Sequence, residues 1–311
     1  ENFESAWTGS PEAPTGWTQT RTVLIGNGIP DGILSTSGEK DWQRNTNTGV
    51  ATWSLSPSTP GVVPNGAVSG TGVAWLQSRD FGGSAQNWGS RRLESPIVNL
   101  SASTSPYVRF WMFFADGSTV VSLRIMGSSD GGTTWRVLQQ VPSNFGQTTV
   151  TSATPWERIS ISIPSDFRTA NMKIGIEYTS IWGTNNLFID DVTIEEFTPT
   201  TITSAMTGNW GSTGTWTGGV VPTSDNNVVI AAGHTVTSNL NNVRMQNLTV
   251  DGTLNYSSAT TTLLNTIQGD LTVSATGTYN SFFSTTGKRT YLGGSLTNAG
   301  TINFGISATS T

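Results

Sequence analysis

The chain has 311 residues, enough for two domains of ordinary size, and no cysteine, which excludes disulfides, thiolate metal sites and a cysteine nucleophile. Only 11% of the residues are charged and the net charge is −5, so no basic stripe is available to neutralise the phosphates of a nucleic acid. No run of about 18 apolar residues predicts a membrane-spanning helix.

The first part of the chain, up to about residue 197, consists of short β-prone runs separated by Gly, Pro and Ser turns. No stretch combines a sustained helical period with helix caps, so we predict a nearly all-β protein. The spacing of the runs is typical of an antiparallel β-sandwich or jelly roll. The clearest predicted strands cover residues 72–77, 107–115, 120–128, 135–141, 157–163, 172–179 and 187–195.

Two short segments set carboxylates inside apolar strand patterns. Glu4 follows Asn-Phe near the start, and Asp190 and Asp191 lie in the run Leu-Phe-Ile-Asp-Asp-Val. Alternation with period two puts Asp190 on the face of Phe188, Val192 and Ile194, with Asp191 on the opposite face. A carboxylate on a core-facing row needs hydrogen bonds, an ion pair or a metal. If the first and last strands are neighbours, we expect Glu4 and Asp190 to close the domain in one oxygen-rich site.

The segment from Ser128 to Trp135 matches the Asp-box, a motif familiar from sialidases. Its physical content is a hairpin in which Asp130 accepts backbone hydrogen bonds, Gly132 supplies an unusual φ and Trp135 packs beneath the turn. Sialidases carry several copies, an arginine cluster and a tyrosine nucleophile. A single copy therefore favours a role in folding.

Two tryptophans fall in predicted loops, whereas most of the others fall in strands or core positions, the usual place for a large aromatic side chain. These are Trp88 and Trp182, and the neighbouring Asn87 and Asn185 can bind hydroxyl groups. We predict these four residues as candidate ligand-binding residues. The alternative is that the two rings cap the sandwich.

The composition changes near residues 195–200. Ten of the 12 tryptophans precede this point, and beyond it only three basic and three acidic residues remain. The Thr-Pro-Thr-Thr stretch predicts a short, stiff linker over residues 198–202. We therefore predict two domains, one over residues 1–197 and one over residues 203–311.

The second domain repeats itself. Each repeat carries a leucine and, eight residues later, an aromatic ring: Leu248 with Tyr256, Leu271 with Tyr279, and Leu296 with Phe304. Such a period, with short strands, indicates a right-handed parallel β-solenoid (β-helix) that turns Leu, Val and Ile inward and Thr, Ser and Asn outward. Three or four coils are barely enough for stability, so we expect the repeats to continue beyond residue 311.

Catalytic roles find little support in the sequence. His234 is the only histidine, so any Ser-His-Asp triad or zinc site would depend on it, and it lies in a repetitive, uncharged region. A surface or stacking role is expected for it. Asp190 and Asp191, turned to opposite faces of one strand, do not suit the paired carboxylates of a glycosidase.

The polar face of the solenoid raises two further possibilities. Ice binding needs a flat, regular threonine array, but Thr249, Thr272 and Thr297 are followed two residues later by Asp, Ser and Ala. A pectate lyase-like site would need clustered Asp, Arg and Lys, and charges are scarce in this half of the chain. We therefore expect neither function.

The first domain resembles MAM-like jelly rolls, especially the cleaved-adhesin and choice-of-anchor type domains of secreted proteins from Bacteroidetes. The resemblance covers about residues 1–197 and depends on the order and spacing of several short motifs. These are Phe3-Glu4, Pro-Thr-Gly-Trp at 14–17, Asp-Trp-Gln-Arg at 41–44, Gly-Val-Ala-Trp-Leu at 72–76, Ser-Pro-Ile at 95–97, Arg-Phe-Trp-Met at 109–112, the segment 128–135, Trp-Glu-Arg at 156–158 and Phe-Ile-Asp-Asp-Val at 188–192.

This resemblance implies a structural calcium ion, since related jelly rolls often use the glutamate after the first Phe and the aspartates of the last strand. The implied ligands are Glu4, Asp190 and Asp191, with Asp41 as a weaker addition. Calcium takes six to eight oxygen ligands, including carboxylates and backbone carbonyls. The alternative is that these acids cap turns or pair with Arg44, Arg91 or Arg92.

The second domain is similar to solenoid modules of large surface proteins from the same bacteria. The similarity lies in Gly208-Asn209-Trp210, in Gly-Thr-Trp-Thr-Gly-Gly-Val-Val-Pro at 214–222 and in Asp-Asn-Asn-Val-Val-Ile at 225–230. Many proteins of this make-up are exported by the type IX secretion machinery, which implies a secreted or cell-surface location.

Together these observations predict a non-catalytic, adhesin-like protein with no nucleic-acid partner and no membrane span. The jelly roll would bind a glycan or a surface protein, and the solenoid would act as a rigid spacer. The alternative is that both are accessory modules of a larger secreted peptidase or polysaccharide-degrading enzyme.

Overall fold

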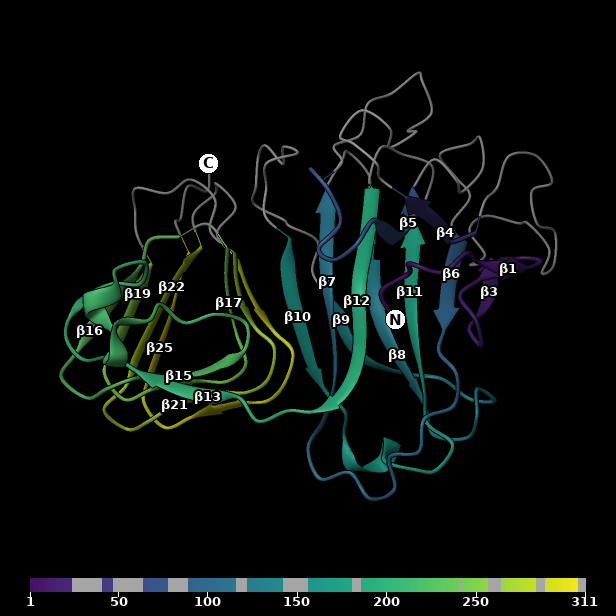
Figure 1. Ribbon diagram of the computed structural model, residues 1–311. Coiled ribbons are helices and arrows are strands. Elements are labelled where there is room, and N and C mark those ends of the chain that lie inside the picture. Colours follow the sequence, from purple (N-terminus) through teal and green to yellow (C-terminus); the bar gives the residue numbers. More distant parts are fainter. Residues whose placement is uncertain are drawn as a thin grey trace, which may run out of the picture. The chain divides into compact units, whose positions relative to one another are not determined.

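The computed structural model describes residues 1–23, 41–46, 64–77, 89–115, 122–141, 156–180, 186–240, 242–256, 264–283 and 289–306. They form two compact units, and the boundary between the two along the chain lies between Phe197 and Thr198. The architecture is all-β, as the sequence predicts (Figure 1). Within the described residues, no helix has the length and hydropathy needed to cross a membrane.

The first unit is an antiparallel sandwich of two five-stranded sheets. One sheet has the order β3 (Thr18–Val23), β6 (Gly89–Glu94), β11 (Lys173–Ser180), β8 (Ser122–Ser128) and β9 (Arg136–Val141). The other has the order β10 (Glu157–Ser162), β7 (Pro106–Ala115), β12 (Asn186–Glu196), β5 (Gly72–Gln77) and β4 (Gln43–Thr46). A small ribbon of β1 (Thr8–Gly9) and β2 (Glu12–Ala13) and a 3-10 turn η2 (Ser165–Phe167) complete the unit.

The predicted strands of this unit correspond to β5 and to β7 through β12, which confirms the sandwich. Strand β6 was not predicted, because four of its six residues are polar or charged. Leu93 is fully buried between the sheets, whereas Arg92 and Glu94 form an ion pair with N–O distance 2.9 Å. One apolar side chain is too weak a period-two signal to reveal a strand.

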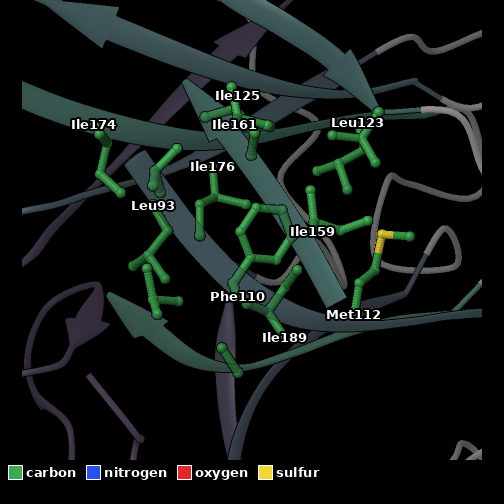
Figure 2. Close-up of a cluster of buried hydrophobic side chains, with 14 of the residues drawn as sticks. Leu93, Phe110, Met112, Leu123, Ile125, Ile159, Ile161, Ile174, Ile176 and Ile189 are labelled. Carbon is green, nitrogen blue, oxygen red and sulfur yellow. The ribbon is translucent and has the colours of Figure 1, made fainter. Parts of the chain in front are cut away.

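Apolar side chains from both sheets fill the space between them. Figure 2 shows the ring of Phe110 among Ile159, Ile176 and Ile189, which come from β7, β10, β11 and β12. All four side chains are 0–2% exposed. Burying a side chain of this size fully contributes roughly 1.5–3 kcal/mol, so each of these side chains stabilises the packing of the two sheets.

The last strand, β12, contains a β-bulge that changes the predicted parity. Its pairing with β7 shifts just after Asp190, and Asp191 adopts a positive φ of 49°. Phe188 belongs to a small outer cluster, but Val192 and Ile194 pack into the main core. The prediction that Val192 and Ile194 share the face of Phe188 was therefore wrong, because counting by two cannot anticipate an inserted residue.

The second unit is a parallel β-solenoid with three sheets, which confirms the predicted coil architecture. The first sheet contains β13 (Thr200–Thr203), β15 (Asn226–Ile230), β18 (Leu248–Val250), β21 (Leu271–Val273) and β24 (Leu296–Asn298). The second contains β14 (Gly208–Asn209), β16 (Thr235–Ser238), β19 (Thr253–Tyr256), β22 (Thr278–Phe283) and β25 (Thr301–Ile306). The third contains β17 (Asn242–Met245), β20 (Leu264–Ile267) and β23 (Arg289–Leu292).

Two details of the solenoid differ from the sequence expectation. Strand β13 begins at Thr200, within the stretch predicted as a linker, because its backbone pairs in parallel with β15. Tyr279 lies opposite Leu254 rather than opposite Tyr256, because the corner before β22 is longer than the corner before β19. The two rings still meet edge-on, and their hydroxyl oxygens are 2.6 Å apart.

Glycines occupy the corners between the first and second solenoid sheets, where successive coils approach most closely. A Cβ atom at Gly277 would lie 1.9 Å from the carbonyl oxygen of Val250, and one at Gly300 would lie 2.1 Å from that of Ser274. The backbone carries the contact instead, since Thr278 N donates to Gly252 O. Any side chain at these corners would separate the coils.

Candidate functional site

Three carboxylates of the sandwich bind one short segment, residues 67–72, which we name the strap. The backbone N–H groups of Val68 and Ser69 donate to Asp190 Oδ2 at 2.9 and 3.2 Å. The Ser69 hydroxyl donates to Asp191 Oδ1 at 2.7 Å. The two aspartates therefore reach the same residue, although they were predicted on opposite faces. The bulge at Asp191 is the physical reason.

Glu4 binds the other end of the strap. Its Oε1 atom accepts hydrogen bonds from Thr71 N at 2.9 Å and from Gly72 N at 2.7 Å. A Cβ atom at Gly70 would lie 2.3 Å from the same oxygen, and one at Gly72 would lie 2.2 Å from Phe3 O. The two glycines therefore allow the N-terminal segment to cross the strap in direct contact.

The two ends of the first unit are joined beside the strap. Val192 N donates to Glu1 O at 2.8 Å, and the amino group of Glu1 donates to Val192 O at 2.5 Å. The Arg44 guanidinium donates to Phe3 O at 2.6 Å and to Glu4 O at 2.5 Å. The expected meeting of the first and last segments is thus present, but Glu4 and Asp190 bind different strap residues.

Among these carboxylates, Asp190 is the one whose ionised form is disfavoured by its surroundings. Its side chain is fully buried, and burial raises the pKa of Asp190 to about 6 even though Ser69 N, Asp191 N and Val68 N all donate to it. The negative charge of Asp191 raises this pKa further. In contrast, the pKa of Glu4 is lowered, chiefly by the hydrogen bond from Gly72 N.

Asp41 lies outside this group of carboxylates. Arg21 Nη2 donates to Asp41 Oδ2 at 2.7 Å, and Arg91 Nε lies 3.7 Å from Asp41 Oδ1. Asp41 is therefore paired with arginine, which is the alternative to metal binding given for it above. The neighbouring Trp42 is held by the Gln19 side chain, because Trp42 N donates to Gln19 Oε1 at 2.8 Å.

Two of the remaining acids, Asp190 and Asp191, lie at one end of the strap and are the described residues that would hold a calcium ion there. Asp190 and Asp191 bring two carboxylates to Ser69, and carboxylate oxygens are ligands that calcium prefers. The raised pKa of Asp190 marks negative charge that a cation would stabilise. Among the described residues, no three acidic or histidine side chains converge on one metal position. Backbone carbonyls or hydroxyls would therefore have to supply the other ligands.

The strap itself was not recognised from the sequence. Its signal is the run Ser-Gly-Thr-Gly at residues 69–72, which leads into β5 and in which two glycines flank Thr71. Such glycine-rich runs are usually assigned to turns. The apolar side of the strap was equally hidden: Ala67 packs on the outer cluster that contains Trp75, Phe113 and Phe188.

The predicted ligand-binding residues Asn87, Trp88, Trp182 and Asn185 lie outside the described residues. The strand ends that flank them are described. Gly89, the first residue of β6, pairs with Ser180, the last residue of β11. The chain segments that contain the two tryptophans thus leave the sandwich from neighbouring strands.

The Asp-box hairpin has the structure that its sequence predicts. Asp130 accepts hydrogen bonds from Thr134 N at 2.9 Å and from Thr134 Oγ1 at 2.6 Å, and these bonds hold the pKa of Asp130 well below its usual range. Trp135 Nε1 donates to Gly132 O at 2.9 Å. The Arg92 guanidinium stacks 4.3 Å from the Trp135 ring centroid. These contacts support a role in folding.

His234 lies at a corner of the solenoid. Its Nδ1 atom is 2.9 Å from the hydroxyl of Ser204, and that hydroxyl also accepts a hydrogen bond from Ala231 N. Ser204 is only 3% exposed. The pair therefore ties two corner segments together, which agrees with a structural role.

Comparison with known proteins gives partial matches. A family model described as the G8 domain matches residues 215–278, which include β15 to β21 of the solenoid. The search of curated proteins found no match. The G8 match covers less than half of the chain, so it describes this segment alone.

Three of the matching solved structures align with this chain over most of their own length. The K1 cleaved adhesin domain of Lys-gingipain from Porphyromonas gingivalis W83 is 13% identical, with a TM-score of 0.38, over 64% of this chain and 97% of that one. A family 61 carbohydrate-binding module in complex with β-1,4-galactotriose is 16% identical, with a TM-score of 0.29, over 51% and 91%. A family 28 module specific for non-crystalline cellulose is 10% identical, with a TM-score of 0.32, over 58% and 88%. At these values none of them identifies a function.

Proposed function

We propose that this protein is a non-catalytic, adhesin-like protein, secreted or held at the cell surface, whose sandwich binds a glycan or a surface protein. The observation that carries the proposal is the pairing of Gly89 with Ser180, the strand ends next to the segments that contain Trp88 and Trp182. Loops on a rigid scaffold are the usual carriers of binding residues. Two aromatic rings with asparagine neighbours suit the apolar and hydroxyl faces of a sugar.

The acids of the sandwich have structural partners, which supports a role other than catalysis. Glu4, Asp190 and Asp191 bind the strap, and Asp41 pairs with Arg21. We include in the proposal a calcium ion bound by Asp190 and Asp191, which would stabilise the closure of the unit. Export by type IX secretion machinery is also part of the proposal and is supported by the resemblance to Bacteroidetes surface proteins.

The solenoid would act as a spacer in this scheme. Parallel coils joined by hydrogen bonds and a continuous core make a stiff rod, and its few charges limit unspecific attachment. The tryptophan pair Trp210 and Trp216, both at most 2% exposed and T-shaped at 4.8 Å, covers the beginning of that core.

Glycan-array binding by the full chain tests the sandwich proposal. We expect binding to a restricted set of glycans, with at least a tenfold loss in Trp88→Ala and in Trp182→Ala. Trp111→Ala is the matched control, because Trp111 is a half-buried tryptophan within strand β7. Equal losses in all three variants, or unchanged binding in the loop variants, would contradict the proposal. Binding to proteins but to no glycan would indicate that the ligand of the sandwich is a surface protein.

A further inference from the structure

The second solenoid sheet carries a regular polar face that the sequence does not reveal. Parallel register aligns Thr235 with Thr253, Thr278 and Thr301 in one column. It aligns Thr237 with Asn255, Asn280 and Asn303 in a second column. We name these eight residues the Thr/Asn face. They alternate along their strands with Val236, Leu254, Tyr279 and Ile302, which point into the solenoid core.

The first solenoid sheet offers no such face, although it contains the threonines first considered for ice binding. Strands β18 and β21 are three residues long, with only their middle residues, Thr249 and Thr272, turned outward. That sheet therefore carries a single threonine column across β18, β21 and β24, and Val229 of β15 takes the same position in the preceding coil. Strands of the second sheet that have four to six residues provide two outward positions each.

The asparagine column is ordered by its own hydrogen bonds. Asn280 Nδ2 donates to Asn255 Oδ1 at 2.7 Å, and Asn303 Nδ2 donates to Asn280 Oδ1 at 2.7 Å. An amide has two N–H donors and an oxygen with two lone pairs. Asn280 therefore keeps one donor and one acceptor for a partner, held in a fixed direction. In the described part of the chain, the hydroxyls of Thr253 and Thr278 have no protein partner and are equally available.

The chemistry of this face defines its ligand. It contains no ionisable group, which disfavours an acidic or a basic polymer. It contains no aromatic ring, because Tyr256 and Tyr279 point inward and are 5% and 1% exposed. Contacts must therefore go through donor and acceptor pairs. These recur with each coil at about 4.7–4.9 Å, and the two columns are about 7 Å apart along the strands.

We propose that the Thr/Asn face binds an uncharged, extended β-1,4-linked polysaccharide that lies along the solenoid axis. Sugar hydroxyls both donate and accept, and in an extended β-1,4-linked chain the rings follow one another at a distance close to the spacing of the coils. Successive rings are turned by half a turn, so each edge of the chain still offers hydroxyls from every ring, although different ones from one ring to the next. One Asn and one Thr per coil would meet each successive sugar ring. The solenoid would then be a second binding region, in addition to the loops of the sandwich.

Depletion of the full chain from solution by powdered cellulose and by chitin tests this inference. The double variant Thr253→Lys/Thr278→Lys places two bulky charges on the face, and we expect its partition coefficient to fall at least tenfold. The matched control Thr249→Lys/Thr272→Lys makes the same changes on the first sheet of the same two coils, and we expect a change below twofold. Thermal unfolding of each variant verifies that it is folded.

A second pair, Thr253→Ala/Thr278→Ala, removes only the hydroxyls, and a loss of severalfold is expected. The inference fails if the unaltered chain binds neither polysaccharide or if both lysine pairs lose binding equally. It also fails if the chain partitions into growing ice while ignoring both polysaccharides. Because all these variants leave the sandwich unchanged, a loss that follows Trp88→Ala but not the threonine variants would support the sandwich site and overturn this one.

Discussion

The contacts that stabilise each of the two units join residues at very different distances in sequence. In the sandwich, Glu1 pairs with Val192, and Asp190 binds Val68, so its closure needs residues more than 100 positions apart. In the solenoid, Leu248 pairs with Leu271 in the next coil, and each of the other coils of this sheet likewise pairs with the next one along the chain. The sandwich therefore depends on a few remote contacts, whereas the solenoid depends on one local contact made many times.

The units also differ in how they satisfy polar groups. The sandwich buries charges in pairs, such as Glu177, which accepts from both Arg92 and Arg124 at 3.2 and 2.6 Å. The solenoid uses uncharged amides and backbone groups, as in Asn247 Oδ1, which accepts from Asp270 N at 2.7 Å. A change of charge should therefore affect the sandwich through single sites, and a change of shape should affect the solenoid through its corners.

The largest expected effect is at a solenoid corner. In Gly277→Ala, the added Cβ would lie 1.9 Å from Val250 O, so the coils must separate and stability should fall by about 3 kcal/mol. Hydrogen exchange of strands β18 to β22 measures this loss locally. Gly214→Ala is the control, because nothing lies within 4 Å of a Cβ there. Exchange that speeds up equally in the sandwich would show that the two units do not unfold separately.

The next effect concerns Asp190, whose folded pKa of about 6 lies above the ordinary value of 3.8. The folded state keeps its proton longer, so without a cation stability should fall by about 3 kcal/mol as the pH rises from about 4 to about 6. Asp190→Asn should remove this slope. Melting temperatures measured across that range, in EDTA, give the comparison, with Asp41→Asn as the control carboxylate.

Calcium enters the same measurement. At pH 7 the ion should raise the melting temperature of the unaltered chain by several degrees, and Asp190→Asn should abolish that increase. The unaltered chain and the Asp41→Asn variant should respond alike, because Asp41 is paired with arginine. If calcium has no effect on the unaltered chain, the calcium part of the proposed function is wrong, and the strap alone holds the acids.

The smallest effect is expected at an exposed ion pair of the sandwich. Arg136 Nη2 lies 2.5 Å from Asp166 Oδ2, but the two side chains are 59% and 52% exposed. Solvent and salt screen such a pair, so Asp166→Asn should change the free energy of unfolding by at most about 0.5 kcal/mol. Urea titration at low and high salt measures it. A larger change would show that the surface charges of the sandwich act as a network.

Much of the fold could be predicted because strong local patterns specify it. Strand β5 has the bounds that the sequence predicts, and the leucine period of the solenoid matches the pairing of Leu248, Leu271 and Leu296. The aromatic period did not predict pairing, since Tyr279 lies opposite Leu254. Extra residues at one corner preserve the spacing in sequence while shifting the register, and a single sequence gives no sign of this.

The sequence identified the acidic residues of the candidate site, but it did not predict which residues they contact. Burial of Asp190 follows from its apolar strand pattern, but its partners Val68 and Ser69 come from a turn with no apolar signal. The convergence of Asp191 on Ser69 depends on a bulge, which arises from pairing between strands rather than from local sequence. Contacts made by backbone N–H groups carry no side-chain signature, and this explains why the strap was missed.

The corner glycines have a consequence for how the length of this protein can change. Gly252, Gly277 and Gly300 each lie against a carbonyl oxygen of the preceding coil, so successive coils meet through the same type of contact at this corner. Duplication of one whole coil would therefore join onto existing surfaces at both ends. Each duplication would lengthen the rod by about 4.8 Å and leave the rest of the molecule unaltered. The solenoid can therefore be lengthened in fixed steps of one coil.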